Sequence, residues 1–493
     1  MRRPLSALFL LATLWALNAC TDDPLQANEA LALSECRIEG FGGFTRTKAL
    51  CGELIVPLDP ATPDGATVTL FVAKVPALSR AAADSAFTII AGGPGQASTQ
   101  AYASLRGAFE RVRRERDIIL IDQRGTGKSN AQACEFDDTD ADLSNYSPAQ
   151  VRALAQQCLD TLGDDTRFYT TSLAVRDLDQ LRAALGYDTL DIYGVSYGTR
   201  VAQHYLRQYP QHTRTVVLDG VVPVDVPLGP AIATDAQRAL DLIFSRCIND
   251  SDCHVAFGDI ERKFTRLLER TQTAPIALEF VDPISGERSL DDFGYTDLLM
   301  AVRLMSYSPE TAALLPYMIN EADQGNLQPL AAQALLNAEN LGTMLAYGMH
   351  NSVVCTEDVP FYTEEGIDRS TLMNAYMGDL SYQSLIETCT VWPSGPIDDG
   401  FTKPFASDVP VLVLSGEVDP VTPPAYGDRA ARYLGNARAI TLPGQGHGQI
   451  QLGCMPTLLA TFVSTADHAA LDIECLDVQQ PAPFFISPSG SAP

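Results

Sequence analysis

The pattern with the clearest chemical meaning is Gly-Val-Ser-Tyr-Gly at residues 194–198, which matches the G-x-S-x-G motif of a nucleophilic serine. It follows a short apolar stretch, residues 190–193, and precedes a helical pattern. A serine on such a strand-to-helix turn holds its hydroxyl at the helix N-terminus, where the dipole favours developing negative charge. The same spacing also arises by chance in a tight turn of small residues, but the strand and helix around it favour Ser196 as a nucleophile.

The base that activates this serine is expected far along the chain. A serine hydroxyl is a weak nucleophile until a neighbouring base takes its proton, and for this motif the chain order is serine, acid, histidine. Of the six histidines, only His447 and His468 come late enough. His447 lies in a glycine-rich loop at residues 444–448, whereas His468 lies in a polar stretch typical of a surface. We therefore predict His447 as the base.

The acid should leave a strand upstream of the histidine. Residues 411–414 form an apolar run, and Asp419 follows a few positions later. Its carboxylate would hold the imidazole in one tautomer and stabilise the imidazolium. Asp219, at the end of the apolar run 216–218, is the main alternative, and Glu417 is a further one. We predict Asp419 and keep Asp219 as its rival.

Acyl transfer also needs two backbone donors aimed at the developing oxyanion. The N–H of Tyr197, the residue after the nucleophile, is the first candidate. Ala-Gly-Gly-Pro-Gly at residues 91–95 follows an apolar run, and its glycines would let the backbone approach a substrate. We predict the N–H of Gly93 as the second donor; a merely flexible loop is the alternative.

A segment at residues 122–129 ends in Gly-Lys-Ser, like a phosphate-binding loop. That loop requires glycine where Asp122 stands. We expect Asp122 and Arg124 to tie this turn beside the active site instead.

The elements that must position these groups alternate in type along the chain. Short runs rich in valine, isoleucine and leucine alternate with amphipathic helical patterns, as in an α/β fold whose mostly parallel sheet has helices on both faces. Between residues 221 and 405 helical spacing dominates, which predicts a large, mostly helical cap over the C-terminal edge of the sheet. The expected division is a signal peptide at 1–19, a tether at 20–35, a core in two parts at 36–220 and 406–478, the cap at 221–405, and a loose Pro- and Ser-rich tail at 479–493.

Charge excludes one class of partner. The 493 residues carry 34 Lys and Arg against 61 Asp and Glu, a formal charge of −27. A field of this sign repels phosphates, so we do not expect a nucleic-acid binder. The hydrophobic fraction of 46% is that of an ordinary globular protein with ample material for a core.

The N-terminus has the pattern of an export signal. Arg2 and Arg3 precede a mainly apolar run of 13 residues at 5–17, which is too short to span a bilayer. It ends in Leu-Asn-Ala-Cys, which resembles a bacterial lipobox and predicts acylation of Cys20; an ordinary signal with a chance cysteine is the alternative. Thr21, in place of aspartate, favours the outer membrane. We expect an exported, lipid-anchored protein of the bacterial cell envelope, attached to the membrane through that lipid.

Ten cysteines remain after Cys20, an even number suited to disulfides in an oxidising compartment. No C-x-x-C pair occurs and no histidine stands at finger spacing, so neither zinc nor another metal is expected. Sequential pairing would close short loops, although the sequence leaves other connectivities open. The sequential pairs are Cys36–Cys51, Cys134–Cys158, Cys247–Cys253, Cys355–Cys389 and Cys454–Cys475.

The motifs together resemble those of α/β-hydrolase-fold serine exopeptidases, in particular prolyl iminopeptidase and the tripeptidyl aminopeptidases. The resemblance covers most of residues 36–478, and the stretch 408–447, with Cys454 and Cys475 after it, is similar to the C-terminal region of tripeptidyl aminopeptidases. One departure is Ala91, where the family often has histidine before Gly-Gly-Pro-Gly, and it puts the anchoring of that loop in doubt. The motifs that carry the resemblance lie at residues 92–95, 122–129, 194–199 and 446–448.

The resemblance implies an α/β-hydrolase fold and a serine aminopeptidase of the prolyl or tripeptidyl type. Such an enzyme hydrolyses its peptide substrate near the free N-terminus through an acyl-enzyme, with Ser196, Asp419 and His447 as the triad and no cofactor. It must also bind the α-ammonium group of the substrate, for which Glu357 and Asp358 are the candidates in the cap, although surface acids are commoner. A carboxylesterase or lipase of the same fold and an inactive hydrolase-fold envelope binding protein are the alternatives.

Overall fold

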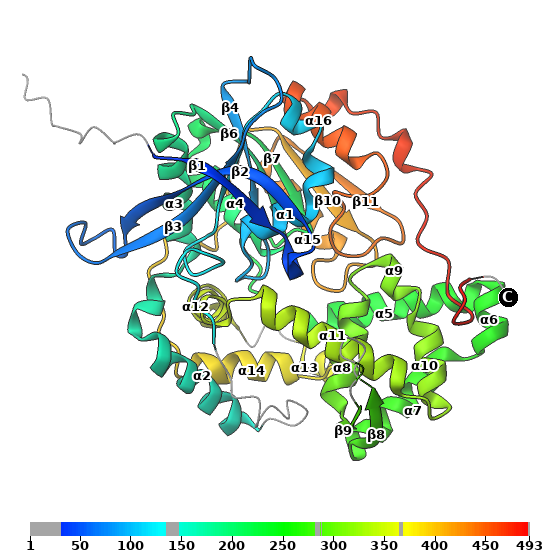
Figure 1. The fold of residues 1–493 in the computed structure, drawn as a ribbon. Helices are drawn as coiled ribbons and strands as arrows, with labels where there is room; N and C mark the ends of the chain where they lie inside the picture. The colour runs from blue at the N-terminus through cyan, green and yellow to red at the C-terminus, as the bar shows by residue number, and fades with distance from the viewer. Residues whose placement is uncertain (1–30, 135–146, 282–285, 287, 364–367, 492–493) are drawn as a thin grey trace, which may run out of the picture.

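The computed structural model describes residues 31–134, 147–281, 286, 288–363 and 368–491. Figure 1 shows two layers, a sheet with its flanking helices above and a mostly helical layer below. The expected signal peptide, Cys20 and the tether as far as residue 30 lie outside the described residues.

One nine-stranded sheet carries the upper layer. Its strands are β1 (Ser34–Glu39), β2 (Arg46–Pro57), β3 (Thr67–Val75), β4 (Ser85–Ile90), β5 (Ile118–Ile121), β6 (Thr189–Val195), β7 (Thr213–Asp219), β10 (Val411–Gly416) and β11 (Ala437–Leu442). They lie in the order β1-β2-β3-β5-β4-β6-β7-β10-β11. The pairings from β1 through β3 to β5 are antiparallel, and all the others are parallel.

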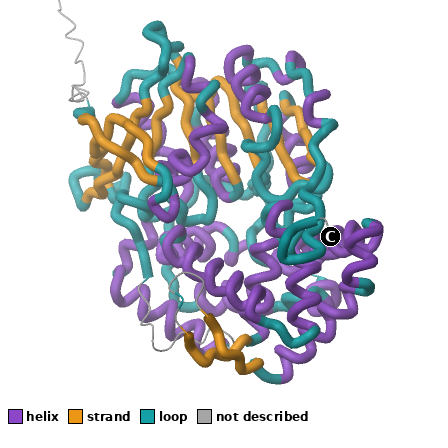
Figure 2. Tube along the Cα trace, turned by 45° about the vertical axis from the view of Figure 1, so that its right-hand side comes forward, coloured by secondary structure: helices purple, strands orange, loops and turns teal. Residues whose placement is uncertain are grey.

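Helices cover both faces of this sheet. Phe87 and Ile89 of β4 pack with one set of helices, and Ala86 and Ile90 pack with the other, so the strand is apolar on both sides. Figure 2 shows the strands side by side above the mostly helical layer. The predicted α/β fold is therefore confirmed. One face carries α1 (Ser98–Phe109) and α16 (Met455–Thr465), and the other carries α3 (Thr171–Ala184), α4 (Tyr197–Gln208) and α15 (Pro424–Leu434).

The first three strands were not predicted from the sequence. In the first half of β3, Val68 and Leu70 are buried, whereas Thr67 and Thr69 are exposed. Antiparallel strands at a sheet edge have one face in water, so their apolar and polar residues alternate. This alternation conceals most of these strands from a search for continuous apolar runs, although β3 has one such run at residues 70–73.

The lower layer is mainly the chain between β7 and β10, and it has its own buried apolar core. A two-stranded hairpin lies at its far end (Figure 1). Its elements are α5 (Ile232–Asn249), α6 (Ser251–Phe257), α7 (Ile260–Thr273), β8 (Ile276–Val281), β9 (Arg288–Phe293), α8 (Tyr295–Met305), α9 (Pro309–Ala312), α10 (Leu315–Asp323), α11 (Gln328–Met344), α12 (Tyr347–Glu357), α13 (Arg369–Asn374) and α14 (Leu380–Cys389).

One helix of the lower layer comes from the chain segment before the nucleophile. The helix α2 (Pro148–Leu162) packs against α14, although we assigned residues 36–220 to the core (Figure 1). Its Leu159 is buried in one cluster with Trp392, beside the Cys134–Cys158 disulfide. An amphipathic pattern shows that a helix buries one face, but it does not show which layer the helix joins.

The ten cysteines of the described residues all form disulfides, which confirms the prediction of a disulfide-bonded protein. Five disulfides indicate an exported protein. Among the residues that the structure describes, no helix has the length and apolar character needed to cross a bilayer. The disulfides are Cys36–Cys51, Cys134–Cys158, Cys247–Cys253, Cys355–Cys389 and Cys454–Cys475.

The C-terminal segment corrects one expectation, because residues 481–486 do not form a loose tail. The segment runs down from the sheet layer onto the cap (Figure 1). Phe484 is buried in the core of the cap, and Cζ of Arg246 lies 4.0 Å from the centroid of its ring. The N–H of Phe485 donates to the carbonyl oxygen of Ala313 at 3.1 Å. Two adjacent aromatic side chains supply the apolar area that docks the segment, despite its Pro- and Ser-rich composition.

Candidate active site

Ser196 stands on the turn between β6 and α4. Its backbone φ is 57° and its ψ is −127°, a strained conformation that costs of order 1–3 kcal/mol for a residue with a side chain. A Cβ on Gly194 would lie 2.3 Å from the carbonyl oxygen of Gly198, and a Cβ on Gly198 would lie 2.2 Å from that of Ile90. The strain persists because strand, turn and helix are packed too closely to relax.

His447 and Asp419 are in hydrogen-bond contact on the loops that follow β11 and β10. Nδ1 of His447 lies 2.8 Å from Oδ2 of Asp419. The carboxylate is buried and accepts the N–H groups of Val421 and Thr422, both at 2.8 Å. The hydroxyl of Thr422 donates to it at 2.7 Å. These contacts fix the orientation of the carboxylate toward the imidazole.

The two groups of this pair change each other's pKa. Burial raises the pKa of Asp419, but the charge and hydrogen bond of His447 outweigh it and bring the pKa below its usual value of 3.8. Burial lowers the pKa of His447, but the charge and hydrogen bond of Asp419 outweigh it and raise the pKa above 6.5. The pair is an ionised carboxylate beside an imidazole that accepts a proton readily, as a general base requires.

Asp219, the rival for the acid, holds the loop that carries His447. Its carboxylate is buried at the end of β7 and accepts the N–H groups of Gln449 at 2.8 Å and Ile450 at 3.0 Å. Burial raises the pKa of Asp219 to about 6. The carboxylate in hydrogen-bond contact with the imidazole is that of Asp419. The geometry therefore favours Asp419 as the partner of the base.

The remaining alternatives lie toward the surface. Glu417 is exposed and accepts the N–H of Gly444 at 2.8 Å. Nε2 of His468 lies 2.9 Å from the side-chain oxygen of Asn436, on the outer side of β11. Neither residue lines the cavity described next.

Ser196 and His447 line the same cavity, of about 530 Å³, between the sheet edge and the cap. Residues 92–94 line it from the sheet side. A Cβ on Gly220 would lie 2.9 Å from Cε1 of His447, so the imidazole lies directly against this glycine. The residue before it, Asp219, accepts the N–H of Ser196 on its carbonyl oxygen at 2.9 Å. The imidazole therefore contacts Gly220, and the turn of Ser196 is hydrogen-bonded to the residue just before this glycine.

Tyr307 of the cap supports the base from the other side. The N–H of His447 donates to the carbonyl oxygen of Tyr307 at 2.6 Å. The two rings meet edge to face, with their centroids 5.2 Å apart. A Cβ on Gly446 would lie 2.2 Å from the same carbonyl oxygen, so this glycine permits the approach. The cap thus contacts the loop of the base directly.

The loop expected to supply the second oxyanion donor is anchored by the cap. Gly93 lines the cavity, and the N–H of Ala346 donates to the carbonyl oxygen of Gly95 at 3.1 Å. This backbone contact anchors the loop without a histidine at the position of Ala91. Tyr197 begins α4, and its N–H belongs to the first helical turn, whose amides have no acceptor within the helix.

The turn at 122–129 has a structural role beside the nucleophile, as expected. Nε and Nη2 of Arg124 contact the carboxylate of Asp177 at 2.7 and 2.8 Å, and both residues are buried. Asp122 accepts two backbone N–H groups, at 3.0 and 3.1 Å. The glutamine between these two residues donates to the hydroxyl of Tyr197 at 3.0 Å. Backbone and side chains of this turn thus brace the start of α4.

Glu357 and Asp358 do not line the cavity, contrary to the expectation that they bind a substrate ammonium group. Both are buried at the end of α12, and burial raises the pKa of Glu357 to about 7. Glu357 accepts the N–H and the hydroxyl of Thr171, at 2.6 and 2.7 Å. Asp358 lies 2.9 Å from Nη2 of Arg200 and accepts the N–H of Leu228 at 2.7 Å. Their partners are groups of the protein itself.

Three residues of the cavity wall with acidic or basic side chains were not found from the sequence. They are Asp235 in the first turn of α5, Arg303 on α8 and His350 on α12. Asp235 accepts the hydroxyl of Tyr426 at 3.0 Å, and burial raises the pKa of Asp235 to about 6. All three stand on cap helices, and the spacing of apolar residues on a helix does not show what its other faces will meet.

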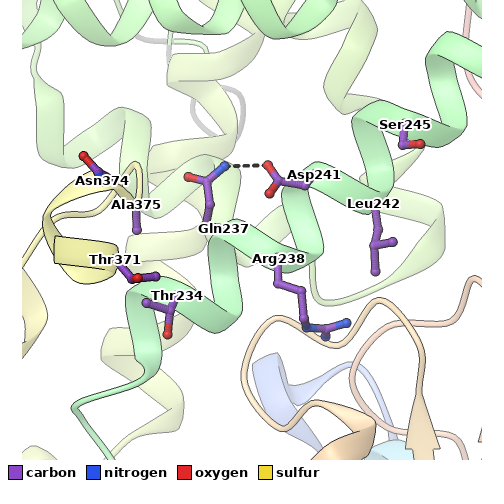
Figure 3. Close-up of a pocket in the computed structure, with 9 residues that line it drawn as sticks. All are labelled: Thr234, Gln237, Arg238, Asp241, Leu242, Ser245, Thr371, Asn374 and Ala375. Atoms are coloured by element: carbon purple, nitrogen blue, oxygen red, sulfur yellow. Dashed lines mark hydrogen bonds between the residues drawn. The ribbon is translucent and has the colours of Figure 1, made fainter. Parts of the chain in front are cut away.

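A second and more open hollow, of about 500 Å³, lies along α5 (Figure 3). There Gln237 donates to the carboxylate of Asp241 at 2.6 Å. Nη2 of Arg238 donates to the carbonyl oxygen of Asp419 at 2.6 Å. Ser196 is not among the residues that line this hollow, so its chemistry is separate from that of the cavity.

Two family models match the chain. The model described as alpha/beta hydrolase fold matches residues 86–246, which contain Ser196. The model described as TAP-like protein matches residues 374–475, which contain Asp419 and His447. The two matches therefore extend into the two ends of the cap and contain the three predicted catalytic residues.

Three named relatives cover most of the chain. Serine protease Hip1 of Mycobacterium tuberculosis is 25% identical over 442 residues, which is 81% of each chain. Tripeptidyl aminopeptidase of Streptomyces coelicolor is 26% identical over 470 residues, 88% of this chain and 84% of that one. Carboxylesterase B of Mycobacterium tuberculosis is 28% identical over 434 residues, 81% of this chain and 80% of that one. The chain therefore has the α/β-hydrolase fold of these serine hydrolases, and its residues 374–475 are similar to TAP-like proteins.

Proposed function

We propose that this chain is a serine aminopeptidase that hydrolyses peptide bonds near the free N-terminus of a peptide, of the prolyl or tripeptidyl type. The observation that carries the proposal is that Ser196 and His447 share one cavity under the cap, with Asp235 in its wall. A cavity roofed by a cap admits the end of a peptide rather than the middle of a folded chain. The relatives named tripeptidyl aminopeptidase and serine protease support the same class of activity.

In the proposed mechanism, the hydroxyl oxygen of Ser196 attacks the carbonyl carbon of the scissile peptide bond. Nε2 of His447 takes the hydroxyl proton, and Asp419, hydrogen-bonded to Nδ1, stabilises the imidazolium. The imidazolium then gives this proton to the leaving nitrogen, the C–N bond breaks, and the N-terminal fragment stays on the serine as an ester. A water molecule, deprotonated by the imidazole, attacks the ester carbonyl. The C–O bond to Ser196 then breaks, the imidazolium returns its proton to the serine oxygen, and the fragment leaves as an acid.

The oxyanion of each tetrahedral intermediate needs donors that are already in place. The N–H groups of Tyr197 and Gly93 are the proposed pair, since one begins α4 and the other lines the cavity. Loss of one such donor typically costs about 3–4 kcal/mol of transition-state stabilisation.

Asp235 takes the place of Glu357 and Asp358 as the proposed partner of the substrate's α-ammonium group. It lines the cavity, and the hydroxyl of Tyr426 binds one of its oxygens at 3.0 Å. Because burial raises its pKa to about 6, the group is ionised at neutral pH but poorly solvated. A cation from the substrate would compensate that loss of solvation.

The test compares a short peptide anilide that has a free amine with its N-acetylated twin. We expect wild type to prefer the free amine by about tenfold to a hundredfold in kcat/KM, the usual worth of a charge-assisted hydrogen bond. Asp235→Asn should lose this preference. Asp241→Asn, on the same helix but in the outer hollow, should keep it.

Two other outcomes would contradict the peptidase proposal. Cleavage of short acyl esters without cleavage of either anilide would make the enzyme a carboxylesterase, like one of its named relatives. Failure of a fluorophosphonate to label Ser196 in the folded protein would indicate an inactive binding protein.

The proposed location is the periplasmic or outer surface of the cell envelope, with a lipid on Cys20 that anchors the protein to the outer membrane. The lipobox-like sequence before this residue supports the anchor, and the disulfides support export. Wild type should take up radiolabelled fatty acid and sediment with outer membranes. Cys20→Ser should do neither, and a labelled or sedimenting variant would contradict the anchor.

A further inference from the structure

The active-site cavity contains a guanidinium group that the proposed mechanism does not use. Arg303 of α8 lines the cavity, and its Nε is buried without a hydrogen-bond partner. Within the described part of the chain, no carboxylate forms an ion pair with Arg303. The ring centroid of Tyr307 lies 5.8 Å from Cζ of the arginine.

The fully buried arginines of the described residues are paired with carboxylates. Nε of Arg124 lies 2.7 Å from Asp177, and Nε of Arg116 lies 2.9 Å from Asp191. Among the half-buried ones, Arg207 and Arg238 donate to backbone carbonyl groups and Arg246 packs on Phe484, whereas Arg303 lines the active-site cavity. The chain has 61 acidic residues against 34 basic ones, so acidic partners are not scarce. Partial removal of a guanidinium from water without a counter-ion is unfavourable. A cavity whose wall has a guanidinium group without a carboxylate partner is therefore suited to an anionic ligand.

The neighbours of Arg303 indicate which part of the substrate it would contact. The ring of Tyr307 neighbours both the guanidinium and the imidazole of His447: its centroid lies 5.8 Å from Cζ of Arg303 and 5.2 Å from the centroid of the His447 ring. The positive charge of Arg303 also acts to lower the pKa of His447, so the two groups are close enough to interact. His447 must hand its proton to the leaving nitrogen, so the leaving group lies on the side of the imidazole.

We propose that Arg303 binds a carboxylate on the leaving-group side of the substrate, a role that rests on the proposed peptidase function. A guanidinium binds a carboxylate through two parallel hydrogen bonds, which gives both strength and orientation. Two parts of a peptide supply such a group: the C-terminal carboxylate of a short leaving fragment, or an acidic side chain next to the scissile bond. Asp235 lines the same cavity, so the cavity offers one anionic and one cationic side chain to a short zwitterionic peptide.

The test uses substrate pairs that differ only in the charge of the leaving group. One pair of peptides carries a leaving alanine as the free acid or as its amide. A second pair carries a leaving glutamate amide or glutamine amide. A third pair consists of acetyl esters of 4-hydroxybenzoic acid and of 4-hydroxybenzamide, which need no free amine and no peptide bond.

For wild type we expect the charged member to be preferred by about tenfold or more in kcat/KM, mainly through KM. Arg303→Gln should reduce the ratio to about one, and Arg303→Lys should restore part of it. The ratio within a pair is unaffected by any loss of folded protein, because misfolding lowers both rates equally. Arg266→Gln is the matched control, since it removes an exposed cationic side chain of the cap outside the cavity, and it should keep the ratio.

The three pairs separate the possible outcomes. A preference in the first pair assigns the ligand as a C-terminal carboxylate, and one in the second pair assigns it as an acidic side chain. A wild-type ratio near one in every pair, or an unchanged ratio in Arg303→Gln, would overturn the carboxylate site while peptide cleavage still supported the proposed function. If no peptide is cleaved but the ester pair shows the Arg303-dependent ratio, the peptidase function fails and the carboxylate site stands.

Discussion

The carboxylate of Asp219 accepts the backbone N–H of Gln449 at 2.8 Å, two residues after the histidine that faces the serine turn. The two residues are far apart in the chain, and their contact joins the end of β7 to the loop after β11. An acid that the sequence offers as a rival to Asp419 thus contacts the backbone of the base loop instead. It acts on the site through His447, as a positioning residue.

Asp219→Asn tests this role. The amide keeps one acceptor oxygen but replaces the other by an NH2 group, which cannot accept the N–H groups that the carboxylate now accepts, so we expect a loss of stability of about 2 kcal/mol. We also expect kcat to fall by about 10²-fold, the usual effect of moving a catalytic group by an ångström. Urea unfolding and steady-state kinetics measure the two effects. Asp225→Asn, which changes a carboxylate paired with exposed Arg429, should change neither, and an equally inactive Asp225→Asn would contradict the assignment.

Asp419→Asn should have the larger catalytic effect. Without the charge beside Nδ1, the imidazole loses its preferred tautomer and the stabilisation of its protonated form, and turnover should fall by about 10⁴-fold. Pre-steady-state acylation with an activated ester measures the loss. If Asp219→Asn lost more activity than Asp419→Asn, the acid of the triad would have to be reassigned.

The pH dependence of kcat/KM should follow His447. The base acts only when neutral, and its pKa is raised above 6.5 because Asp419 outweighs the effect of burial. Activity should therefore rise with pH through a midpoint above 6.5. In Asp419→Asn the residual activity should show this midpoint at lower pH, because the interaction that favours the proton is lost. A midpoint that stays in place would show that another group controls the profile.

Ser196→Ala should abolish both turnover and labelling by a fluorophosphonate. Loss of the nucleophile in a serine hydrolase costs up to about 10⁶-fold in kcat. Ser245→Ala, on the exposed side of α5, removes a hydroxyl outside the cavity and should leave both readouts intact. A loss of less than tenfold in Ser196→Ala would remove the serine from the mechanism.

Phe484→Ala tests the docking of the C-terminal segment. The ring is buried in the cap core and lies under the guanidinium of Arg246, so its removal should cost about 3 kcal/mol in unfolding free energy. Val478→Ala nearby should cost almost nothing, since that side chain is 75% exposed. Equal unfolding midpoints for Phe484→Ala and wild type would restore the interpretation of a loose tail.

The sequence by itself led to Ser196 because the requirement is local: a strained turn needs glycines on both sides and a strand and helix around it. His447 and Asp419 followed from chain order and from loops at strand ends, and the structure brings these two into contact. The same reasoning kept Asp219 as a rival for the acid and did not predict its contacts, because its partners are backbone groups of a loop far away in the chain.

Only the tertiary structure decided what the cap contributes. Glu357 and Asp358 look like free acids in the sequence, yet they contact Thr171 and Arg200 because α12 packs against the helices beside the sheet. No sequence pattern around Asp235 and Arg303 marks them as cavity residues. The spacing of apolar residues shows which face of a helix is buried, but it does not show what its polar residues will contact. Local backbone geometry is encoded in adjacent residues, whereas the charged wall of a cavity is set by how distant helices pack.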